Sequence, residues 1–435
     1  MEPSTASILL IVVMFITLSC GLWIGLALGL VGFISFAAMT NANPALSFGT
    51  TVWGSLNSWT LTALPMFIWM GEILFRSSLS DDMFKGLAPW MQRLPGRLLH
   101  TNVFGCGIFA AISGSSAATC ATIGRMTIPE LRKRGYDDMM NLGSLAGSGT
   151  LGLLIPPSII LIVYGVAAEV SIARLFIAGV IPGIILMLIF STVLMTWAML
   201  QPHKVPDRDA PMTFMQKMNE SRRLIPVVIL IMIVLGSIYT GVATPTESAV
   251  LGVVGSLALT VATGTFNWKM FNDSVMGAVR TNTMIGLILG GAAFLTTAMG
   301  FSGLPRIFAE WINSFGLSQV GLLIALTAVF IILGCLIDGI SMVVLTAAVV
   351  MPAVKAAGID LVWFGIFVVL VVEMAQITPP VGFNLFVIQG LTGRPLGYIA
   401  LAALPFFFAM LAMVAIMVIF PDLATWLPNQ MLGQK

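Results

Sequence analysis

Apolar residues run along this chain in long continuous stretches that short polar segments separate. A membrane-spanning helix needs about 20 predominantly apolar residues, and such stretches recur over the whole length. Transmembrane β-strands would instead alternate over ~10 residues, which these runs do not. The pattern therefore predicts an all-α polytopic membrane protein. Spans are expected near residues 6–20, 24–41, 58–76, 142–166, 175–200, 224–240, 247–264, 281–299, 362–390 and 396–420.

Two further apolar segments, 101–129 and 321–351, do not fit single spans because small polar residues interrupt them. The interruptions read SGSSAAT at 113–119 and IDGIS at 337–341. An interrupted segment whose two ends return to one side of the membrane is a re-entrant hairpin. Irregular backbone is tolerated at that depth only where protein buries it or where it lines a cavity. We therefore expect hairpin 1 at 101–129 and hairpin 2 at 321–351.

Two of the expected spans contain a double proline, Pro156-Pro157 and Pro379-Pro380. Proline removes a backbone donor and clashes with the preceding turn, so a helix breaks there. The spans near 142–166 and 362–390 are thus predicted to be broken helices whose freed carbonyls can bind a ligand. A simple kink is the plainer alternative. A double proline flanked by glycine and threonine, occurring at two symmetric places, exceeds what a kink needs.

Residues 223 positions apart match repeatedly, which indicates an internal repeat. Chance supplies one or two glycine matches in such a chain, but rarely a Pro-Pro pair with a Pro-Gly-Asp set at one spacing. The chain is therefore interpreted as a first copy at 1–200, a polar arm at 201–223 and a second copy at 224–435. The matching pairs are Gly29 with Gly252, Gly32 with Gly255, Pro129 with Pro352, Gly135 with Gly358, Asp137 with Asp360, and the two double prolines.

Basic residues cluster around hairpin 1 and in the arm, whereas Arg306 and Lys355 alone occupy the matching places in copy two. Positive charge marks the cytoplasmic side of a membrane protein. Hairpin 1 is therefore expected to enter from the cytoplasm and hairpin 2 from the opposite face, with both termini periplasmic. Inverted repeats with interrupted helices are typical of secondary transporters, whose site lies near the bilayer midplane. The basic residues are Arg76, Lys85, Arg93, Arg97, Arg132, Lys133 and Arg134 around hairpin 1, and Lys204, Arg208, Lys217, Arg222 and Arg223 in the arm.

Composition supports the membrane interpretation and excludes several other classes. The chain is 58% hydrophobic and 9% charged, whereas soluble domains carry roughly a quarter charged residues. The net charge of +2 comes from scattered loop residues, which excludes a nucleic-acid surface. Four cysteines without a CxxC pair and two histidines indicate neither a disulfide framework nor a cysteine or histidine metal site.

Sequence motifs for enzymes are missing. The chain has no HExxH, no GxSxG and no Walker motif. A GxGxxG match at 147–152 lies inside an apolar helix, whereas a dinucleotide site needs a strand before it and a helix after it. The serines at 113–116 have no histidine in the same apolar set to activate them. We conclude that the chain is not an enzyme and binds no nucleotide, so an ion gradient or a partner must supply the energy.

The hairpin tips carry the oxygen atoms that a sodium ion would need. Hydroxyls and freed carbonyls at Ser113–Thr119 can replace its water shell, and half-helix ends contribute their dipoles. Small residues also serve as plain helix-packing surfaces in membranes. The matching tip Asp338–Ser341 in copy two favours the ion site.

Acidic residues at membrane depth are functional-site hypotheses by default. Asp338 lies at the second tip, and Glu373 lies on the second broken helix. Glu247 follows a Thr-Pro-Thr sequence and could equally mark an ordinary helix start. Glu72 precedes Arg76 by four residues, which favours a plain ion pair. Asp338 is therefore the favoured site candidate.

Four strings together resemble the large membrane (M) subunit of tripartite ATP-independent periplasmic (TRAP) transporters: SGSSAAT, GTLGLLIPPSIILIVYG, GVATPTESAVLG and ITPPVGFNLFVIQG. The resemblance runs over essentially the whole chain. It implies sodium-driven uptake of small organic acids, typically carboxylates, by an elevator movement of the hairpins and broken helices. It also implies a separate small four-span membrane subunit, a periplasmic substrate-binding protein, and a location in the bacterial inner membrane.

The fold that this resemblance implies is similar to that of the divalent anion/sodium symporters, in which paired tips and broken helices hold two sodium ions. Carried over by position, the first sodium site would involve Ser113, Ser115, Ser116 and Gly149, with Thr150 near it, and the second would involve Asp338, Gly339, Ser341, Thr378 and Pro379.

The substrate is then expected between the two tips. Its carboxylate needs donors, and the candidates are Ser115, Ser116, Thr119 and Asn384. Arg125 is a weaker candidate because it stands nine residues past Ser116, about 13 Å along a helix.

Two alternatives stay open at this point. A proton-coupled or exchange-type organic anion transporter would share the architecture, with Asp338 and Glu373 carrying protons. A membrane enzyme or scaffold is the other alternative, but it has no reason to keep two costly helix breaks.

Overall fold

The protein is described by a computed structural model that covers residues 12–14, 16–17, 20–39, 43–77, 79–207, 212–302, 318–334, 337–380 and 382–433. Within these ranges the regular elements are all helical, as expected. Five of the helices are long and apolar enough to cross a membrane, or up to eight if each bent pair forms one span. Most of the span expected near 6–20, together with Arg208 and Arg306, lies outside the described residues.

The helices of the first copy cover most of the expected spans and include segments that the apolar pattern did not predict. Its elements are α2 (Ile24–Met39), α3 (Pro44–Leu56), η1 (Trp59–Thr62), α4 (Ala63–Phe75), α5 (Leu79–Met91), η2 (Arg97–Leu99), α6 (His100–Ser113), α7 (Ser116–Lys133), α8 (Asp138–Gly149), α9 (Leu151–Leu154), α10 (Ile159–Ala167) and α11 (Ile172–Leu200).

The arm is partly helical, and the second copy follows it. The arm region contains η3 (Pro202–Lys204), α12 (Phe214–Ser221) and η4 (Arg222–Leu224). The second copy contains α13 (Ile225–Tyr239), α14 (Pro245–Ala262), α15 (Trp268–Ser302), α17 (Gln319–Gly334), α18 (Gly339–Ala356), α19 (Leu361–Gln376), α20 (Phe383–Thr392), α21 (Leu396–Ile419) and α22 (Asp422–Leu432).

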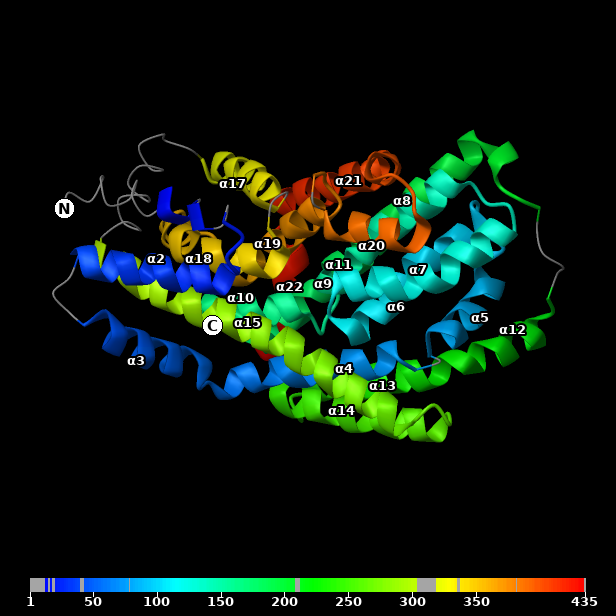
Figure 1. Cartoon of the computed structure of the whole chain (residues 1–435). Coiled ribbons are helices and arrows are strands. Elements are labelled where there is room, and N and C mark those ends of the chain that lie inside the picture. Colours follow the sequence, from blue (N-terminus) through cyan, green and yellow to red (C-terminus); the bar gives the residue numbers. More distant parts are fainter. Residues whose placement is uncertain are drawn as a thin grey trace.

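Both expected hairpins are present as helix pairs interrupted by a short tip. In hairpin 1, α6 ends at Ser113, and its C-cap Gly114 has a φ of 61°, in the left-handed region where glycine is favoured. Ser115 then caps α7, which packs against α6. In hairpin 2, Asp338 caps α18, which packs against α17. Figure 1 shows α6 and α7 toward the end that holds α5 and α12, and α17 and α18 toward the other end.

Both expected broken helices end at their double prolines. The segment Asp138–Leu154 meets α10 at an angle of 43°. In the second copy α19 ends at Gln376, and α20 begins only at Phe383. The Pro156-Pro157 and Pro379-Pro380 bonds are both cis. The helix ends at Leu154 and Gln376 confirm that the helices break at the double prolines.

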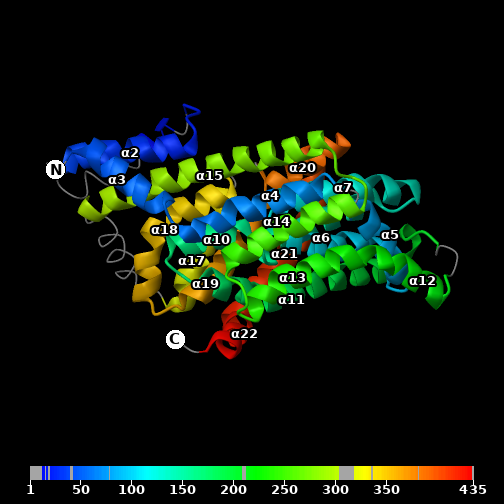
Figure 2. The same ribbon diagram turned by 90° about the horizontal axis from the view of Figure 1, so that it is seen from below.

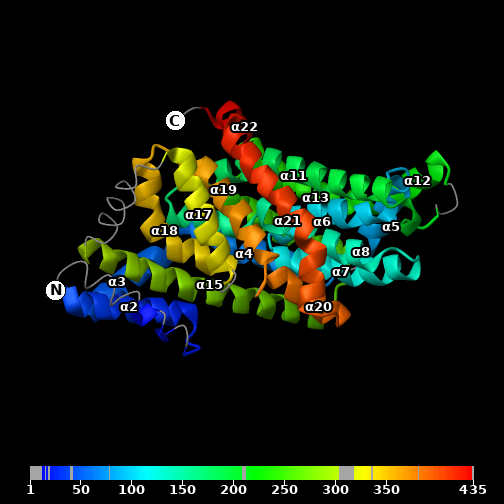
Figure 3. The same ribbon diagram turned by 90° about the horizontal axis from the view of Figure 1, so that it is seen from above.

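The two copies are interlocked along their broken helices and hairpins. Helix α8 of copy one packs against α21 of copy two, α7 against α20, and α10 against α18. At Gly143 the approach is so close that an added Cβ would lie 2.1 Å from the carbonyl oxygen of Ala402. Figure 3 shows α21 crossing the molecule over this region. Much of the core therefore lies between the copies.

Long helices form a second layer alongside this interlocked body. Helix α15 packs against α2, α3 and α4, and α14 packs against α4 and α13, as Figure 2 shows from below. An added Cβ on Gly291 would lie 2.3 Å from the carbonyl oxygen of Gly25, so α15 and α2 touch backbone to backbone. Helix α3, which the apolar pattern did not predict, meets the η1–α4 segment at 61°.

The arm is attached to α5. The indole N–H of Trp90 donates to the Ser221 hydroxyl over 2.6 Å, and Arg223 forms an ion pair with Asp82 at 3.1 Å. The ammonium group of Lys217 lies 5.8 Å from the centre of the Trp90 ring. Side chains of the linking segment therefore tie it to the first copy.

Candidate functional site

Three hydroxyl groups at the tip of hairpin 1, those of Ser113, Ser115 and Thr119, make hydrogen bonds within the tip. The Ser113 and Thr119 hydroxyl oxygens lie 2.6 Å apart, and Thr119 is fully buried. The Ser115 side chain accepts the Ala118 N–H over 3.4 Å and so caps α7. The tip is thus a compact polar turn inside an apolar body, as SGSSAAT predicted.

This tip is locked against the first broken helix. The Ile159 N–H, two residues after the double proline, donates to the Gly114 carbonyl over 3.2 Å. An added Cβ on Gly152 would lie 2.5 Å from the Ser115 carbonyl oxygen and 2.7 Å from the Thr119 hydroxyl. The tip of hairpin 1 therefore packs directly against the broken helix of copy one. Gly152 allows this close approach because it has no side chain.

The tip of hairpin 2 is built around Asp338. One carboxylate oxygen of Asp338 accepts the N–H groups of Ile340 and Ser341, each over 3.1 Å. The other oxygen accepts the Ser341 hydroxyl, and Ser341 is fully buried. Asp338 is therefore an N-cap of α18 in this structure. Its proposed contact with sodium stays a prediction.

The second tip packs against α19 and α10. An added Cβ on Gly339 would lie 2.5 Å from Val372, 3.0 Å from the Gln376 side-chain nitrogen and 3.4 Å from Ile160. Because Ile159 contacts the first tip and Ile160 lies beside the second, the first turn of α10 stands between the two tips. The sequence did not predict this role for α10.

The second break exposes backbone oxygen atoms. An added Cβ on Gly382 would lie 3.0 Å from the Thr378 carbonyl oxygen and 3.1 Å from that of Gln376, so these two carbonyls converge. The Thr378 hydroxyl is already bonded to the Met374 carbonyl at 2.7 Å. Thr378 is half-buried and Pro379 is exposed. The two converging carbonyl oxygens are candidate ligands for a cation, and the Thr378 hydroxyl oxygen keeps its lone pairs because it only donates its hydrogen.

Gly149 and Thr150 face away from each other. A Cβ on Gly149 would meet Cys120 at 2.9 Å and the Asn384 side-chain nitrogen at 3.2 Å. The Thr150 hydroxyl instead donates to the Gly147 carbonyl over 2.5 Å and lies 3.7 Å from the Met410 sulfur. Gly149 thus lies near hairpin 1, whereas the Thr150 hydroxyl lies beside Met410 of α21.

Asn384 is buried where α7, α8 and α20 meet. Its side-chain nitrogen donates to the Ala146 carbonyl over 3.4 Å. Its side-chain oxygen has no hydrogen-bond partner in the described part of the chain. The Cys120 thiol lies 4.0 Å from the Asn384 backbone oxygen. Asn384 therefore packs against hairpin 1. Its contact with a substrate between the tips stays a prediction.

Three acidic residues differ sharply in their surroundings. Glu72 forms the expected ion pair with Arg76. Glu247 forms a capping box with Thr244, whose N–H donates to the carboxylate over 2.8 Å, which confirms the helix-start interpretation. Glu373 is 1% exposed, and neither of its carboxylate oxygens has a hydrogen-bond partner among the described residues.

Arg125 lies on the exposed side of α7, with its guanidinium 4.8 Å from the centre of the Phe75 ring. This cation–π contact occupies the side chain away from the tip, as its helical spacing predicted.

The oxygen atoms at the tips suit an alkali cation better than a transition metal. They are hydroxyl, carbonyl and carboxylate oxygens, the hard ligands that hard cations prefer. Within the described ranges, no three His, Cys, Asp or Glu side chains group so as to hold a metal ion.

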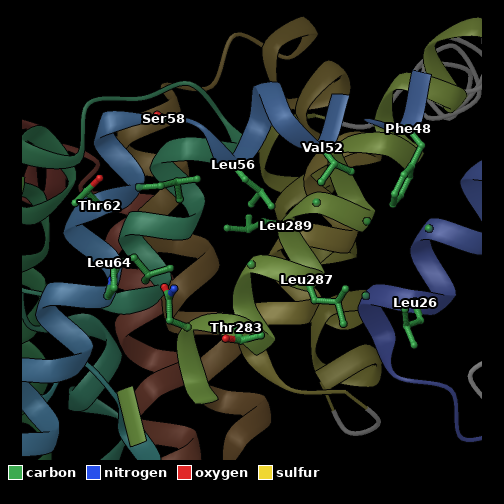
Figure 4. Close-up of a pocket in the computed structure, with 18 of the residues that line it drawn as sticks. Leu26, Phe48, Val52, Leu56, Ser58, Thr62, Leu64, Thr283, Leu287 and Leu289 are labelled. Carbon is green, nitrogen blue, oxygen red and sulfur yellow. The ribbon is translucent and has the colours of Figure 1, made fainter. Parts of the chain in front are cut away.

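A cavity of about 670 Å³ lies elsewhere, between α2, α3, α15 and the η1–α4 segment. Figure 4 shows leucine, valine and phenylalanine side chains lining it, with Ser58, Thr62 and Thr283 among the polar residues. No tip residue borders this cavity. The substrate position predicted between the tips therefore does not coincide with it.

Comparison with known proteins places this architecture in context. A family model described as "Tripartite ATP-independent periplasmic transporter, DctM component" matches residues 11–423. The C4-dicarboxylate TRAP transporter large permease protein DctM of Pseudomonas aeruginosa is 32% identical over 374 residues, which is 85% of this chain and 86% of that protein.

Two further matches extend the comparison. The sialic acid TRAP transporter large permease protein SiaM of Vibrio cholerae is 26% identical over 96% of this chain and 97% of its own. The crystal structure of the Alcanivorax borkumensis YdaH transporter superposes with a TM-score of 0.64 at 14% identity, over 95% of this chain and 98% of that one. At that identity the structural match concerns the fold alone.

Proposed function

The chain belongs to the family of DctM components of tripartite ATP-independent periplasmic transporters, and from this premise we propose that it imports small organic acids in symport with sodium. As a large permease it is a multi-pass membrane transport subunit and not an enzyme. The relatives transport C4-dicarboxylates and sialic acid by name. Both are carboxylates, which supports a small carboxylate as the substrate class.

One structural observation carries the proposal: the first turn of α10 lies between the two hairpin tips, and each tip packs beside a broken helix. This arrangement supports two cation positions on either side of one anion. Sodium at each tip would offset the charge of the carboxylate and neutralise the polar tips before they cross the apolar layer.

The proposed movement is an elevator. Its mobile part would comprise α6–α10 and α17–α20, which the interlocked copies hold together as one body. The static part would comprise α2–α4 and α13–α15. In this proposal the arm lies in the cytoplasm, both termini lie in the periplasm, and the membrane is the bacterial inner membrane.

The proposed partners are a small four-span membrane subunit and a periplasmic substrate-binding protein, which is how TRAP large permeases work in general. The binding protein would deliver the organic acid to the outward-facing side. Its identity determines much of the choice among C4-dicarboxylates, sugar acids and other carboxylates.

The proposal is tested in proteoliposomes that contain the full set of partners, with radiolabelled succinate and sialic acid as probes. Uptake should require an inward sodium gradient and should not be restored by potassium. Uptake that persists without a sodium gradient would overturn the proposal. Dependence on a pH gradient instead would establish the proton-coupled alternative.

Two substitutions test the tips. Ser116→Ala removes a hydroxyl from the first tip, and Asp338→Asn removes the charge of the second while keeping an efficient N-cap. Each should raise the sodium concentration for half-maximal uptake about tenfold, the equivalent of ~1.4 kcal/mol of lost binding. Asp360→Asn is the matched control because Asp360 caps α19 in the same way, through the Trp363 N–H at 2.8 Å, away from the tips. Equal sodium dependence in all three variants would refute the site assignment.

A further inference from the structure

Glu373 is a buried acid for which the hydrogen-bond network of the described residues provides no partner. It lies in the last turns of α19, is 1% exposed, and leaves both carboxylate oxygens without a hydrogen bond. An unpaired carboxylate in such surroundings is strongly unfavourable unless a cation or a proton accompanies it. The position therefore requires a positively charged companion.

Hairpin 1 supplies a polar group beside this acid. The Ser116 side chain approaches the Glu373 carboxylate without completing a hydrogen bond. Ser116 and Cys120 are four residues apart and so share one face of α7. Ser116 is also the first residue of α7, where the positive end of the helix dipole favours an ionised carboxylate over a neutral one.

Asn384, which lies beside Cys120, has another oxygen atom without a partner among the described residues. Cys120 lies against Gly149 of α8 and the backbone oxygen of Asn384, and the side-chain oxygen of Asn384 is buried and unbonded within the described ranges. Glu373 and Asn384 thus each lie beside a residue in the first two turns of α7, and three of their side-chain oxygen atoms have no hydrogen-bond partner among the described residues. All three belong to copy two.

We propose that Glu373 is the carboxylate ligand of a monovalent cation bound between the start of α7 and the end of α19. This inference rests on the proposed sodium coupling and gives it a specific acid. Hydroxyl, amide and carboxylate oxygens form a hard donor set that suits sodium. An organic anion does not fit this position because the carboxylate would repel it.

The carboxylate of Glu373 would balance the charge of the two tips. The first tip has no acid of its own, whereas the second has Asp338. With Glu373 reaching across from copy two, each tip has one carboxylate beside it. A cation at Glu373 would also tie hairpin 1 to α19, so that its binding stabilises the contact between the copies.

The test uses the purified chain with its membrane partner in nanodiscs, and sodium chloride as the probe against potassium chloride at equal ionic strength. Thermal unfolding and uptake in proteoliposomes are measured over a range of sodium concentrations. A ligand that binds only the folded state raises the unfolding temperature. Glu373→Gln, which keeps the shape and removes the charge, should lose most of this sodium-specific shift and raise the half-saturating sodium concentration at least tenfold.

Glu247→Gln is the matched control. It removes one charge by the same substitution, but Glu247 is exposed and glutamine serves equally in a capping box. This variant should keep the sodium response of the original protein. Glu373→Asp, which retains the charge on a shorter side chain, should shift the sodium midpoint without abolishing the response, and it replaces Glu373→Gln if that variant does not fold.

The outcomes distinguish a failure of the proposed sodium coupling from a failure of the Glu373 site. If the original protein shows no sodium-specific response, the proposed function fails regardless of Glu373. If the original protein responds and the Glu373 variants respond with the same midpoint, the present inference is overturned. Retention of the sodium midpoint together with a changed dependence on pH would identify a bound proton and would also overturn it.

Discussion

Replacing Gly152 with alanine tests the contact on which the first tip depends. The new Cβ would lie 2.5 Å from the carbonyl oxygen of Ser115 and 2.7 Å from its carbonyl carbon. Carbon–oxygen contacts normally begin at about 3.3 Å, so the tip must move away from α9 by roughly 0.8 Å. The nearest atoms belong to the backbone, which cannot rotate aside as a flexible side chain would.

The cost follows from two opposing terms. Overpacking a close contact costs about 1–3 kcal/mol, and alanine regains ~1 kcal/mol over glycine in a helix. Subtracting the second term from the first, we expect a net loss of up to ~2 kcal/mol in the free energy of unfolding. Sodium binding should suffer more, because metal ligands tolerate displacements of only about 0.2 Å.

The assay is thermal unfolding together with the sodium dependence of uptake. Gly152→Ala should unfold at a lower temperature and require several-fold more sodium. Gly236→Ala is the control, since an added Cβ there has no neighbour within 4 Å. It should be neutral or more stable. If Gly152→Ala matched Gly236→Ala in both measurements, the tight contact between tip and break would be refuted.

Three further predictions concern the periphery of the site. Thr244→Ala should lower the stability of the protein by about 1 kcal/mol because it removes the N-cap of α14, and Thr244→Ser should restore it in the same unfolding assay. Asp138→Asn should weaken the packing of α8 on α20 and α21, since Asp138 pairs with Arg132 at 2.6 Å and Arg394 at 2.8 Å. For these partly exposed charges we expect a loss of ~1 kcal/mol or less that shrinks with added salt. Arg394→Gln should have the same effect, and the double variant should show less than the sum if the two side chains act as one pair.

The elements that the sequence predicted well share a simple physical origin. The double prolines end helices because proline lacks an N–H, and the small polar interruptions become hairpin tips because few other residues allow such a turn in an apolar body. Helix α3 was missed because its segment is short and mixed in polarity. Its start was nevertheless marked by Asn43 as N-cap and by Pro44 in the first turn.

The contacts between the copies could not be predicted in this way. Periodicity tells which face of a helix is apolar, but not which distant helix covers it. The approach of Glu373 to Ser116 and the position of α10 between the tips depend on such long-range packing. The direction of Thr150 toward Met410, away from the tip, is a further example. Sequence indicated Glu373 only as an acid at membrane depth, without its neighbours.

The interlocked copies have a consequence for how the protein is made. Cys120 of hairpin 1 contacts Asn384, which follows it by 264 residues. At about 5–20 residues per second, the ribosome needs roughly 13–50 s to complete that interval. During this time the first hairpin resides in the bilayer without the helices that later enclose it. Insertion of the first half is therefore provisional, because the contacts of α7 with α20 and of α8 with α21 form only when the second half arrives.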